Sequence, residues 1–525
     1  MGSAWSGPRA GAGEHIIKPI PKIQANPDTD ERYRRLTQLI KLNHNEHSLF
    51  YHHLEYHNHM PHILGSAYLL GGSVEHLHRI YEKESKELEH WEDSPEEIDP
   101  DNWRVHLGDK EYQRAYLHFF EEEIVKGGDN WKKTVFRYLT DEYIPDKRLP
   151  HENNQLLHGL AEGLGHPLIH LGYALELEDK GIAAEALAMV AASYHKMHEF
   201  IDNPYPPEPF ITTTEIREIL DKLFEDPNYD DFVKENGPGH PDKVFDDPPY
   251  LEFNTYIIKK TLDKLAETFQ KHIEASVMLL MTTHKVGDPE YDFFLAHTLT
   301  SAHALRVVLP EMQTELPADL ALQQTWHLLR SHMILMSTVY ISQGRPTIKD
   351  WFVEEYDVKG KDWKYVHEKA LAGKEQFQYD AHYVKVLRTL EEFENLFGKG
   401  DQTDSKYDMY LKAAVKFADE FHGWTGFSGS EANKLDIKET HHDHDHDHDH
   451  GEHEHEHEHE HEHEHEHEHE HEHEHEHEHE HEHEHHDEGH HSDNDEHHDH
   501  DEHHGEHHSD HEEHHEEHHE HHDEH

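Results

Sequence analysis

The sequence predicts an all-α protein, and three observations support that fold class. Apolar residues recur at helical spacing in one segment after another from about Asp30 onward. No set of alternating apolar and polar residues appears that could pair into a sheet. Asp, Gly and Pro residues punctuate the segments as helix boundaries do. We therefore expect a large multi-helix bundle over residues 31–440, after a flexible segment over residues 1–30 and before a disordered tail over residues 441–525.

The individual helices follow from their boundary residues. In "DKEYQRAYLHFFEEEIVKGG", Asp109 is a typical N-cap, and Gly127 and Gly128 end the helix. Residues 154–201 form a predicted helical hairpin whose only punctuation is Gly181. Further helices are predicted over residues 248–284, 288–310, 316–344, 380–398 and 406–424. The Pro-rich stretches are predicted to be loops, and they cover residues 202–211 and 236–250.

Composition separates the tail from the rest of the chain. The 85 residues from His441 contain 41 His and 38 Asp or Glu, but no Lys, Arg or apolar residue. Such a segment cannot offset the entropy of ordering, so disorder is expected. The tail accounts for more than half of the formal net charge of −66. Its imidazoles would offset that charge below about pH 6.5, and they can bind Zn, Ni or Cu loosely.

Several classes of function are disfavoured by what the rest of the chain contains. Its acidic balance argues against nucleic acid as a partner, since phosphate binding needs clustered Lys and Arg. Cysteine is absent, which excludes disulfides, thiolate ligands and cysteine nucleophiles. No apolar run approaches the about 20 residues of a transmembrane helix. The N-terminus lacks a secretory apolar core but fits the myristoylation pattern at Gly2. We expect a cytoplasmic protein.

Histidines on apolar segments are the candidates for a metal site. The candidate ligands are His59, His62, His166, His170, His297 and His382. Most of them lie three or four residues from another polar candidate, a spacing that puts both side chains on one helix face. Histidines that face the interior of a helical bundle are a common way to build a metal centre. Each alone is more simply interpreted as an ordinary core or surface histidine, but four such segments in one cysteine-free chain favour an open site for iron or another first-row metal.

Motifs for other chemistries are missing before the tail. There is no Gly-x-Gly-x-x-Gly after a strand, no Walker A sequence, no Gly-x-Ser-x-Gly and no His-Glu-x-x-His. A flavin or NADPH site therefore has no support from sequence motifs.

Four segments together resemble the motifs of a known family. "HNHMPHILGSAYLLGGSVEHLHRIYE", "HPLIHLGYALE", "FFLAHTLTSAHAL" and "DAHYVKVLRTL" are similar, in that order, to the questin oxidase-like family over about residues 40–425. Family members are assigned as Baeyer–Villiger-type oxidases of anthraquinone and aflatoxin-type polyketide pathways, and are commonly called NADPH-dependent. A related anthraquinone-cleaving member is described as a non-haem iron dioxygenase that uses four histidines and a carboxylated lysine.

The resemblance implies an all-helical oxidoreductase that oxygenates or opens a ring of a small aromatic polyketide with O2. Its ligands would be His59 or His62, His166 or His170, His297 and His382, with Lys385 as the carboxylated lysine. Ile63 and His303 depart from the family pattern and leave the exact ligand set open. Two alternatives remain, namely an NADPH-dependent Baeyer–Villiger oxidase without iron and a non-enzymatic metal buffer or sensor that acts through the tail.

Overall fold

The all-α prediction is confirmed by a computed structural model of the chain. It describes residues 17–23, 25, 28–140, 155–202, 211–230, 241, 244–245, 256–258, 265–373, 376–398 and 408–426. These residues all belong to one compact unit, Met1–Asp445. The expected tail and most of both Pro-rich stretches lie outside the described residues. No helix among those described is long and apolar enough to cross a membrane.

The first half of the chain contributes a layer of helices that are short and mostly amphipathic. They are α1 (Glu31–Glu46), α2 (Met60–Leu69), α3 (Val74–Glu84), η1 (Lys110–Tyr112), α4 (Gln113–Lys126), α5 (Trp131–Thr140), η2 (Leu156–Gly159), α6 (Glu162–Leu177), α7 (Lys180–Ala192) and α8 (Met197–Asp202). Of these, α6 and α7 are buried almost throughout, because their neighbours cover them on several sides.

The second half contributes the longest helices and a smaller group near the C-terminal end. They are α9 (Ile216–Glu225), η3 (Pro227–Tyr229), α11 (Leu265–Thr282), α12 (Phe293–Glu315), α13 (Ala318–Ser342), α14 (Trp351–Glu354), α15 (Trp363–Ala372), η7 (Phe377–Tyr379), α16 (Ala381–Phe397) and α17 (Met409–Glu420).

Strands occur only as short pairs in the described part of the chain. The antiparallel pair is β1 (Phe50–Tyr51) with β2 (Tyr56–His57). The parallel pairs are β3 (Ile211–Thr213) with β4 (Tyr256–Ile258), and β5 (Tyr291–Asp292) with β6 (Trp424–Thr425). No sheet of more than two strands occurs among the described residues, which agrees with the missing alternating pattern in the sequence.

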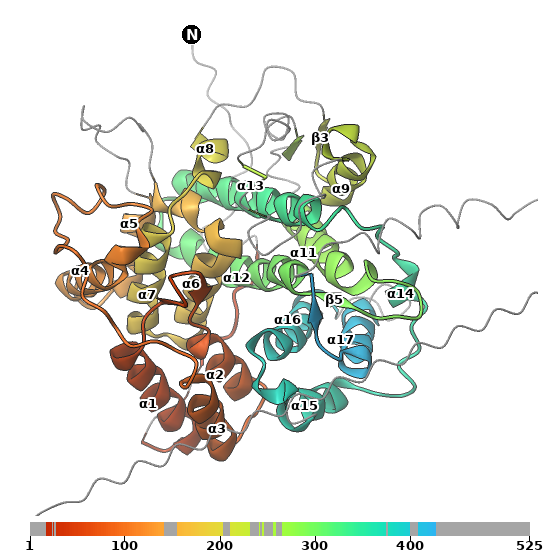
Figure 1. Cartoon of the computed structure of the whole chain (residues 1–525), viewed down its shortest axis with the longest axis horizontal. Helices are drawn as coiled ribbons and strands as arrows, with labels where there is room; N and C mark the ends of the chain where they lie inside the picture. Colours follow the sequence, from red (N-terminus) through yellow and green to blue (C-terminus); the bar gives the residue numbers. More distant parts are fainter. Residues whose placement is uncertain are drawn as a thin grey trace, which may run out of the picture. The chain divides into compact units, whose positions relative to one another are not determined.

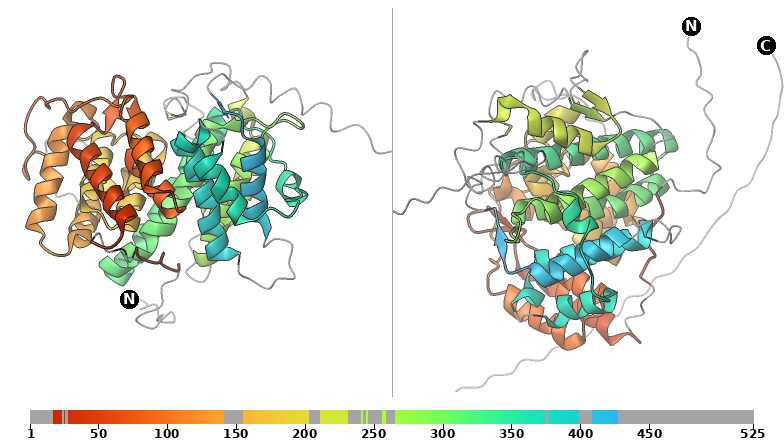
Figure 2. Two further views of the ribbon diagram at one scale, coloured as in Figure 1. Left: turned by 90° about the horizontal axis from the view of Figure 1, so that it is seen from below. Right: turned by 90° about the vertical axis from the view of Figure 1, so that its right-hand side faces the viewer.

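Helix α12 is the centre of the arrangement. It packs against α6 and α5 from the first half, and against α11, α13 and α16 from the second. Figure 1 shows α12 crossing the middle of the helical body, and the left view of Figure 2 shows it between the N-terminal and C-terminal helices. Every residue from Phe294 to Pro310 is buried, so this part of the helix is covered by other elements on all sides. A polar side chain on this segment therefore lies inside the protein.

The predicted boundaries are partly right. Asp109 caps η1, which leads directly into α4, and α4 ends at Gly127 as expected. The expectation that Gly181 interrupts the hairpin was wrong, because Gly181 lies inside α7. The break falls at Glu178, which adopts a left-handed conformation. Asp179 then caps α7 by accepting the backbone N–H groups of its first turn, and this cap outweighs the weak helix propensity of glycine.

The described part of the N-terminal segment contacts the bundle. Ile17 is 3% exposed and packs in the hydrophobic core. Arg306 donates to the backbone carbonyl of Lys18 at 2.5 Å, and Lys22 pairs with Glu178 at 3.2 Å. These contacts attach residues 17–22 to α6 and α12.

Candidate metal centre

Four histidines from four separate segments form a closed ring. The centroids of successive imidazoles are 4.9 Å apart for His59 and His166, and 4.8 Å apart for His166 and His297. The next two separations are 4.8 Å between His297 and His382 and 4.6 Å between His382 and His59. We call these four residues the histidine ring. It brings together four of the six histidines that the sequence proposed.

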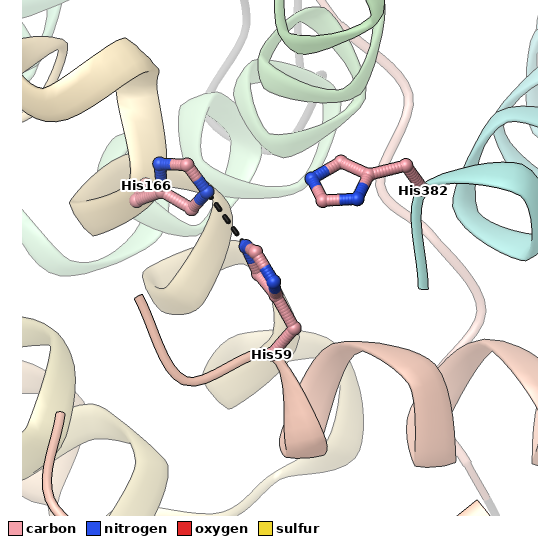
Figure 3. Close-up of side chains that lie close together, drawn as sticks. All are labelled: His59, His166 and His382. Carbon is pink, nitrogen blue, oxygen red and sulfur yellow. Dashed lines mark hydrogen bonds between the residues drawn. The ribbon is translucent and has the colours of Figure 1, made fainter. Parts of the chain in front are cut away.

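The ring nitrogens face one another across a space that a metal ion could fill. One nitrogen each of His59, His166 and His382 lies within 4.8 Å of the other two, and Figure 3 shows these three side chains converging. The Nε2 atoms of His59 and His166 are 2.7 Å apart, and those of His297 and His382 are 3.2 Å apart. Nitrogens at such distances need a proton or a cation between them.

Backbone carbonyls fix the orientation of two of these rings. The Nδ1–H of His166 donates to the carbonyl of Gly163 at 2.6 Å, and that of His297 donates to the carbonyl of Phe293 at 2.9 Å. In the neutral ring, a proton on Nδ1 leaves the lone pair on Nε2. Histidines that bind metals usually donate their second ring N–H in this way. Both rings therefore present the nitrogen and the tautomer that a metal needs.

Burial keeps the ring histidines neutral. Loss of solvent lowers the pKa of His297 to about 3, with a smaller effect from the nearby charge of Lys385. The same two causes hold the pKa values of His59 and His382 well below the usual range, and burial does so for His166. Neutral imidazole is the form that binds metals, so protons do not compete for these nitrogens near pH 7.

Lys385 lies one turn after His382 on α16, as the spacing predicted. Its side chain is 1% exposed, and its Nζ has no hydrogen-bond partner within the described part of the chain. Burial lowers its pKa to about 7, although the charge of Asp380 opposes that shift. A buried amine without a partner is costly and is usually explained by function. The unpartnered amine and the converging neutral nitrogens fit a bound metal ion.

The start of α16 is held in place by its own cap. Asp380 accepts the backbone N–H groups of His382 and Tyr383, each at 2.9 Å, and also the indole N–H of Trp424 at 2.8 Å. The ring of Phe293 packs 4.5 Å from that of His382. These contacts fix the first turn of α16 relative to α12, and with it His382 and Lys385.

The other two predicted histidines form a pair of their own. His62 Nε2 lies 3.0 Å from His170 Nδ1, and His170 Nε2 lies 2.6 Å from a carboxylate oxygen of Glu185. The structure therefore takes one histidine of each predicted pair into the ring and places the other beside it. His303 does not join them, and its Nε2 lies 3.6 Å from a carboxylate oxygen of Glu176.

Two features of the centre were missed in the sequence. His57 was not among the candidate ligands, but it lies in strand β2, and its ring stacks on that of His166 with centroids 3.9 Å apart. Residues 163–165 form a left-handed turn, with φ of 53°, 59° and 77°, inside a segment predicted to be plain helix. The two glycines of "GLGHP" were the available signal, because glycine adopts positive φ most easily.

Replacement of Gly165 by alanine is expected to disturb the centre through this turn. A Cβ there would meet Leu335 at 3.0 Å and Ser301 at 3.1 Å, in addition to the strain of φ +77°. Gly71→Ala is the matched control, because Gly71 has φ +96° and open space around it. Urea unfolding should show a loss of about 1–2 kcal/mol for the control and a larger loss for Gly165→Ala. Equal losses would contradict the role of close packing here.

Comparison with known proteins agrees with this geometry. A profile of the questin oxidase-like family matches residues 56–390, which include the whole histidine ring and Lys385. The chain belongs to the questin oxidase-like family. It is therefore an oxidoreductase, and the matched residues include the segments that build the candidate metal centre.

Curated relatives of the questin oxidase-like protein come from fungi. It is 24% identical over 383 residues to a questin oxidase of Aspergillus terreus, a match that covers 69% of this chain and 81% of the relative. It is 24% identical over 429 residues to the Baeyer-Villiger oxidase AgnL3 of Paecilomyces divaricatus, covering 75% and 88% of the two chains. It is 26% identical over 394 residues to the oxidoreductase AflY of Aspergillus parasiticus, covering 69% and 73%.

Proposed function

We propose that the protein is a metal-dependent oxygenase that uses O2 to oxygenate or open a ring of an aromatic polyketide. The observation that carries the proposal is the closed ring of four neutral histidines, three of them buried, whose Nε2 atoms converge. Imidazole suits iron and other first-row divalent ions. Such an ion, when bound, supplies the redox chemistry that lets O2 react with an aromatic ring.

In this proposal, His59, His166, His297 and His382 hold the metal, and Lys385 adds a fifth ligand. At a pKa of about 7, much of the amine of Lys385 is neutral at physiological pH. A neutral amine can add CO2, which forms an N–C bond and releases one proton to give a carbamate. The carbamate offers an anionic oxygen, which balances the charge of a divalent ion among neutral imidazoles. An unmodified lysine would instead leave a partly charged amine among them.

The proposed substrate class rests on the names of the relatives. The absence of motifs for other cofactors supports the choice of a metal. Two relatives that this chain matches over most of their length are named questin oxidase and Baeyer-Villiger oxidase. A planar aromatic molecule would approach on the side of His59, which is the ring histidine that retains partial exposure. The other three ring histidines are buried, so they exclude water from the side away from that approach.

The proposal is tested by metal analysis combined with oxygen uptake. The full chain is purified without oxygen, supplied with iron, and washed with a weak chelator to remove ions held loosely by the tail. We expect about one tightly held iron per chain and oxygen uptake when a hydroxylated anthraquinone is added. Absence of tightly held metal would contradict the proposal. NADPH consumption that depends on substrate and is insensitive to strong chelators would instead support a Baeyer–Villiger oxidase without metal.

A further inference from the structure

A second set of buried side chains runs from beside the histidine ring toward the surface. Its members come from α2, α6, α7, α1 and α4, and are His62, His170, Glu185, His44 and Glu121. The successive hydrogen-bond distances are 3.0, 2.6, 2.6 and 2.8 Å. We call this set the Glu185 chain. Only Glu121, at its outer end, is exposed, at 41% of its side chain.

Glu185 determines the hydrogen-bond directions in the Glu185 chain. Its burial alone would raise its pKa, but hydrogen bonds from His170 and His44 lower the pKa to about 2. The carboxylate is therefore ionised, and both of its oxygens can only accept hydrogen bonds. His44 lies between Glu185 and Glu121. Burial would lower its pKa, but the hydrogen bonds to the two carboxylates raise it to about 10. His44 thus carries both ring protons and places one positive charge between the two carboxylates.

The tautomers of the next two histidines follow from this arrangement. His170 must donate its Nε2–H to Glu185. In a neutral His170 this leaves the lone pair on Nδ1, which then accepts the Nε2–H of His62. The lone pair of His62 is then on Nδ1. That atom is buried and has no hydrogen-bond partner within the part of the chain that the structure describes.

The ring of His62 is also fixed in place next to the centre. It lies nearly parallel to the ring of Tyr173, with centroids 4.9 Å apart and an interplanar angle of 19°. Its centroid is 5.5 Å from that of His59 in the histidine ring. A buried acceptor without a partner is unfavourable, so its presence beside a reaction centre points to a ligand that pairs with it.

We propose that Nδ1 of His62 accepts a hydrogen bond from a hydroxyl group of the substrate, and that Glu185 sets this role through His170. The inference rests on the proposed function and adds to it a residue that contacts a hydroxyl group of the aromatic substrate. Glu185 is a positioning residue, because it acts through His170 and His62. If the tautomers of His170 and His62 were reversed, Nδ1 of His62 would be a hydrogen-bond donor. The site would then no longer favour a substrate hydroxyl over a group that has no proton to donate.

The tautomer is tested first, without turnover, by ¹⁵N-resolved NMR of the full chain. Buried ring N–H protons exchange slowly with water and stay visible, whereas those of the exposed tail exchange away. Signals of His62 are assigned by their loss in His62→Gln. We expect a proton on Nε2 and none on Nδ1, and no change at Nδ1 when Zn is bound. A proton on Nδ1 would overturn the proposal, and so would a large shift of Nδ1 with Zn, since His62 would then be a metal ligand.

The positioning role is tested with Glu185→Gln. His44 donates its Nδ1–H, so the amide oxygen of Gln at position 185 should face His44. The amide NH2 group then faces His170 and donates to its Nε2. This reverses the tautomers of both His170 and His62. We expect the His62 proton to move to Nδ1 while the tight metal content is unchanged. The ratio of kcat/KM for a hydroxylated anthraquinone to that for its methyl ether should fall about tenfold, as expected for one hydrogen bond.

The matched control is Asp202→Asn. Asp202 is also a carboxylate held between two histidines, with His158 Nδ1 at 2.5 Å and His198 Nδ1 at 2.8 Å. It should leave both the His62 tautomer and the substrate ratio unchanged. A reversed tautomer with an unchanged ratio in Glu185→Gln would overturn the substrate contact. If the wild type turned over neither compound, the proposed function would fail along with the substrate contact, and the wild-type spectrum would still decide the tautomer.

Discussion

His297→Ala is expected to lose the tightly bound metal and, with it, activity. His297 contributes one of the four converging Nε2 atoms, and its Nδ1–H is already committed to Phe293. A ring of three neutral imidazoles binds a divalent ion more weakly than a ring of four. Even residues that only orient metal ligands contribute about 10–100-fold, so removal of a ligand should lower kcat by more than about a hundredfold. Metal analysis and oxygen uptake on the chelator-washed protein measure both effects.

The control for this variant is His332→Ala. His332 is as fully buried as His297, and its Nε2–H donates to the carbonyl of Thr298 at 3.0 Å, with the hydroxyl of Ser301 3.1 Å from the same nitrogen. Both substitutions leave a cavity of the same size, so both should lower the thermal midpoint to a similar extent. Only His297→Ala should lose metal. Loss of metal in both variants, or in neither, would show that the histidine ring is not the metal site.

Lys385→Met is expected to abolish activity and to stabilise the metal-free protein at the same time. The thioether side chain has a similar volume but no group that must be paired. Burial of an unpartnered polar group costs about 1–3 kcal/mol, and this cost would disappear. The metal would lose the ligand that the carbamate supplies. Urea unfolding of the metal-free protein, together with metal content and oxygen uptake, separates the two effects.

The pH dependence of this stability difference has a defined sign. The pKa of Lys385 is about 7 in the folded protein, against 10.5 in the unfolded chain. At pH values between these two pKa values, the unfolded chain binds more protons than the folded protein, so the free energy of unfolding of the wild type rises with pH. The advantage of Lys385→Met should therefore be largest below pH 7 and should shrink by at most about 1.4 kcal/mol per pH unit up to about pH 10. A difference that is constant over this range would contradict an unpaired amine.

A second buried lysine provides the contrast. Lys416 is 3% exposed but has partners, since its Nζ lies 3.0 Å from His284 Nε2 and pairs with Glu420. Lys416→Met removes the ion pair and leaves the charge of Glu420 with the hydroxyl of Tyr291 but without the lysine cation, so it should destabilise the protein. It should leave the tight metal content unchanged. Opposite signs of the stability change for the two lysines would therefore report whether each amine is paired.

The sequence predicted the helical fold and the positions of the candidate ligands for a clear physical reason. A histidine on a strongly apolar helix is buried with the rest of that helix. The segments that carry the candidate ligands could therefore be identified from the sequence. Choosing within each pair was beyond the sequence. His59 joins the ring because it precedes the first residue of α2, and His62 instead faces His170. Which histidine joins the ring depends on how α2 packs against α6. That packing brings together residues such as His59 and His166, which are 107 positions apart in the sequence.

Local backbone geometry was the other feature that the sequence could not supply. The left-handed turn at Gly163–Gly165 places a carbonyl next to His166 Nδ1, and periodicity does not encode that direction. Likewise, Asp179 rather than Gly181 marks the hairpin break, because a side-chain cap decides where a helix begins. The role of Glu185 was also missed, since an acidic residue within an Ala-rich helix has no meaning until its partners are known.

The four ring histidines are supplied by segments that are far apart in the chain. Two of their contacts join residues separated by 107 and 85 positions. An ion bound to them would close several long loops at once, and no local fragment could hold it in the same way. Because such an ion binds the folded chain and not the unfolded one, it stabilises the fold by mass action. The quantity of intact enzyme in a cell would then depend on how much metal the cell can provide.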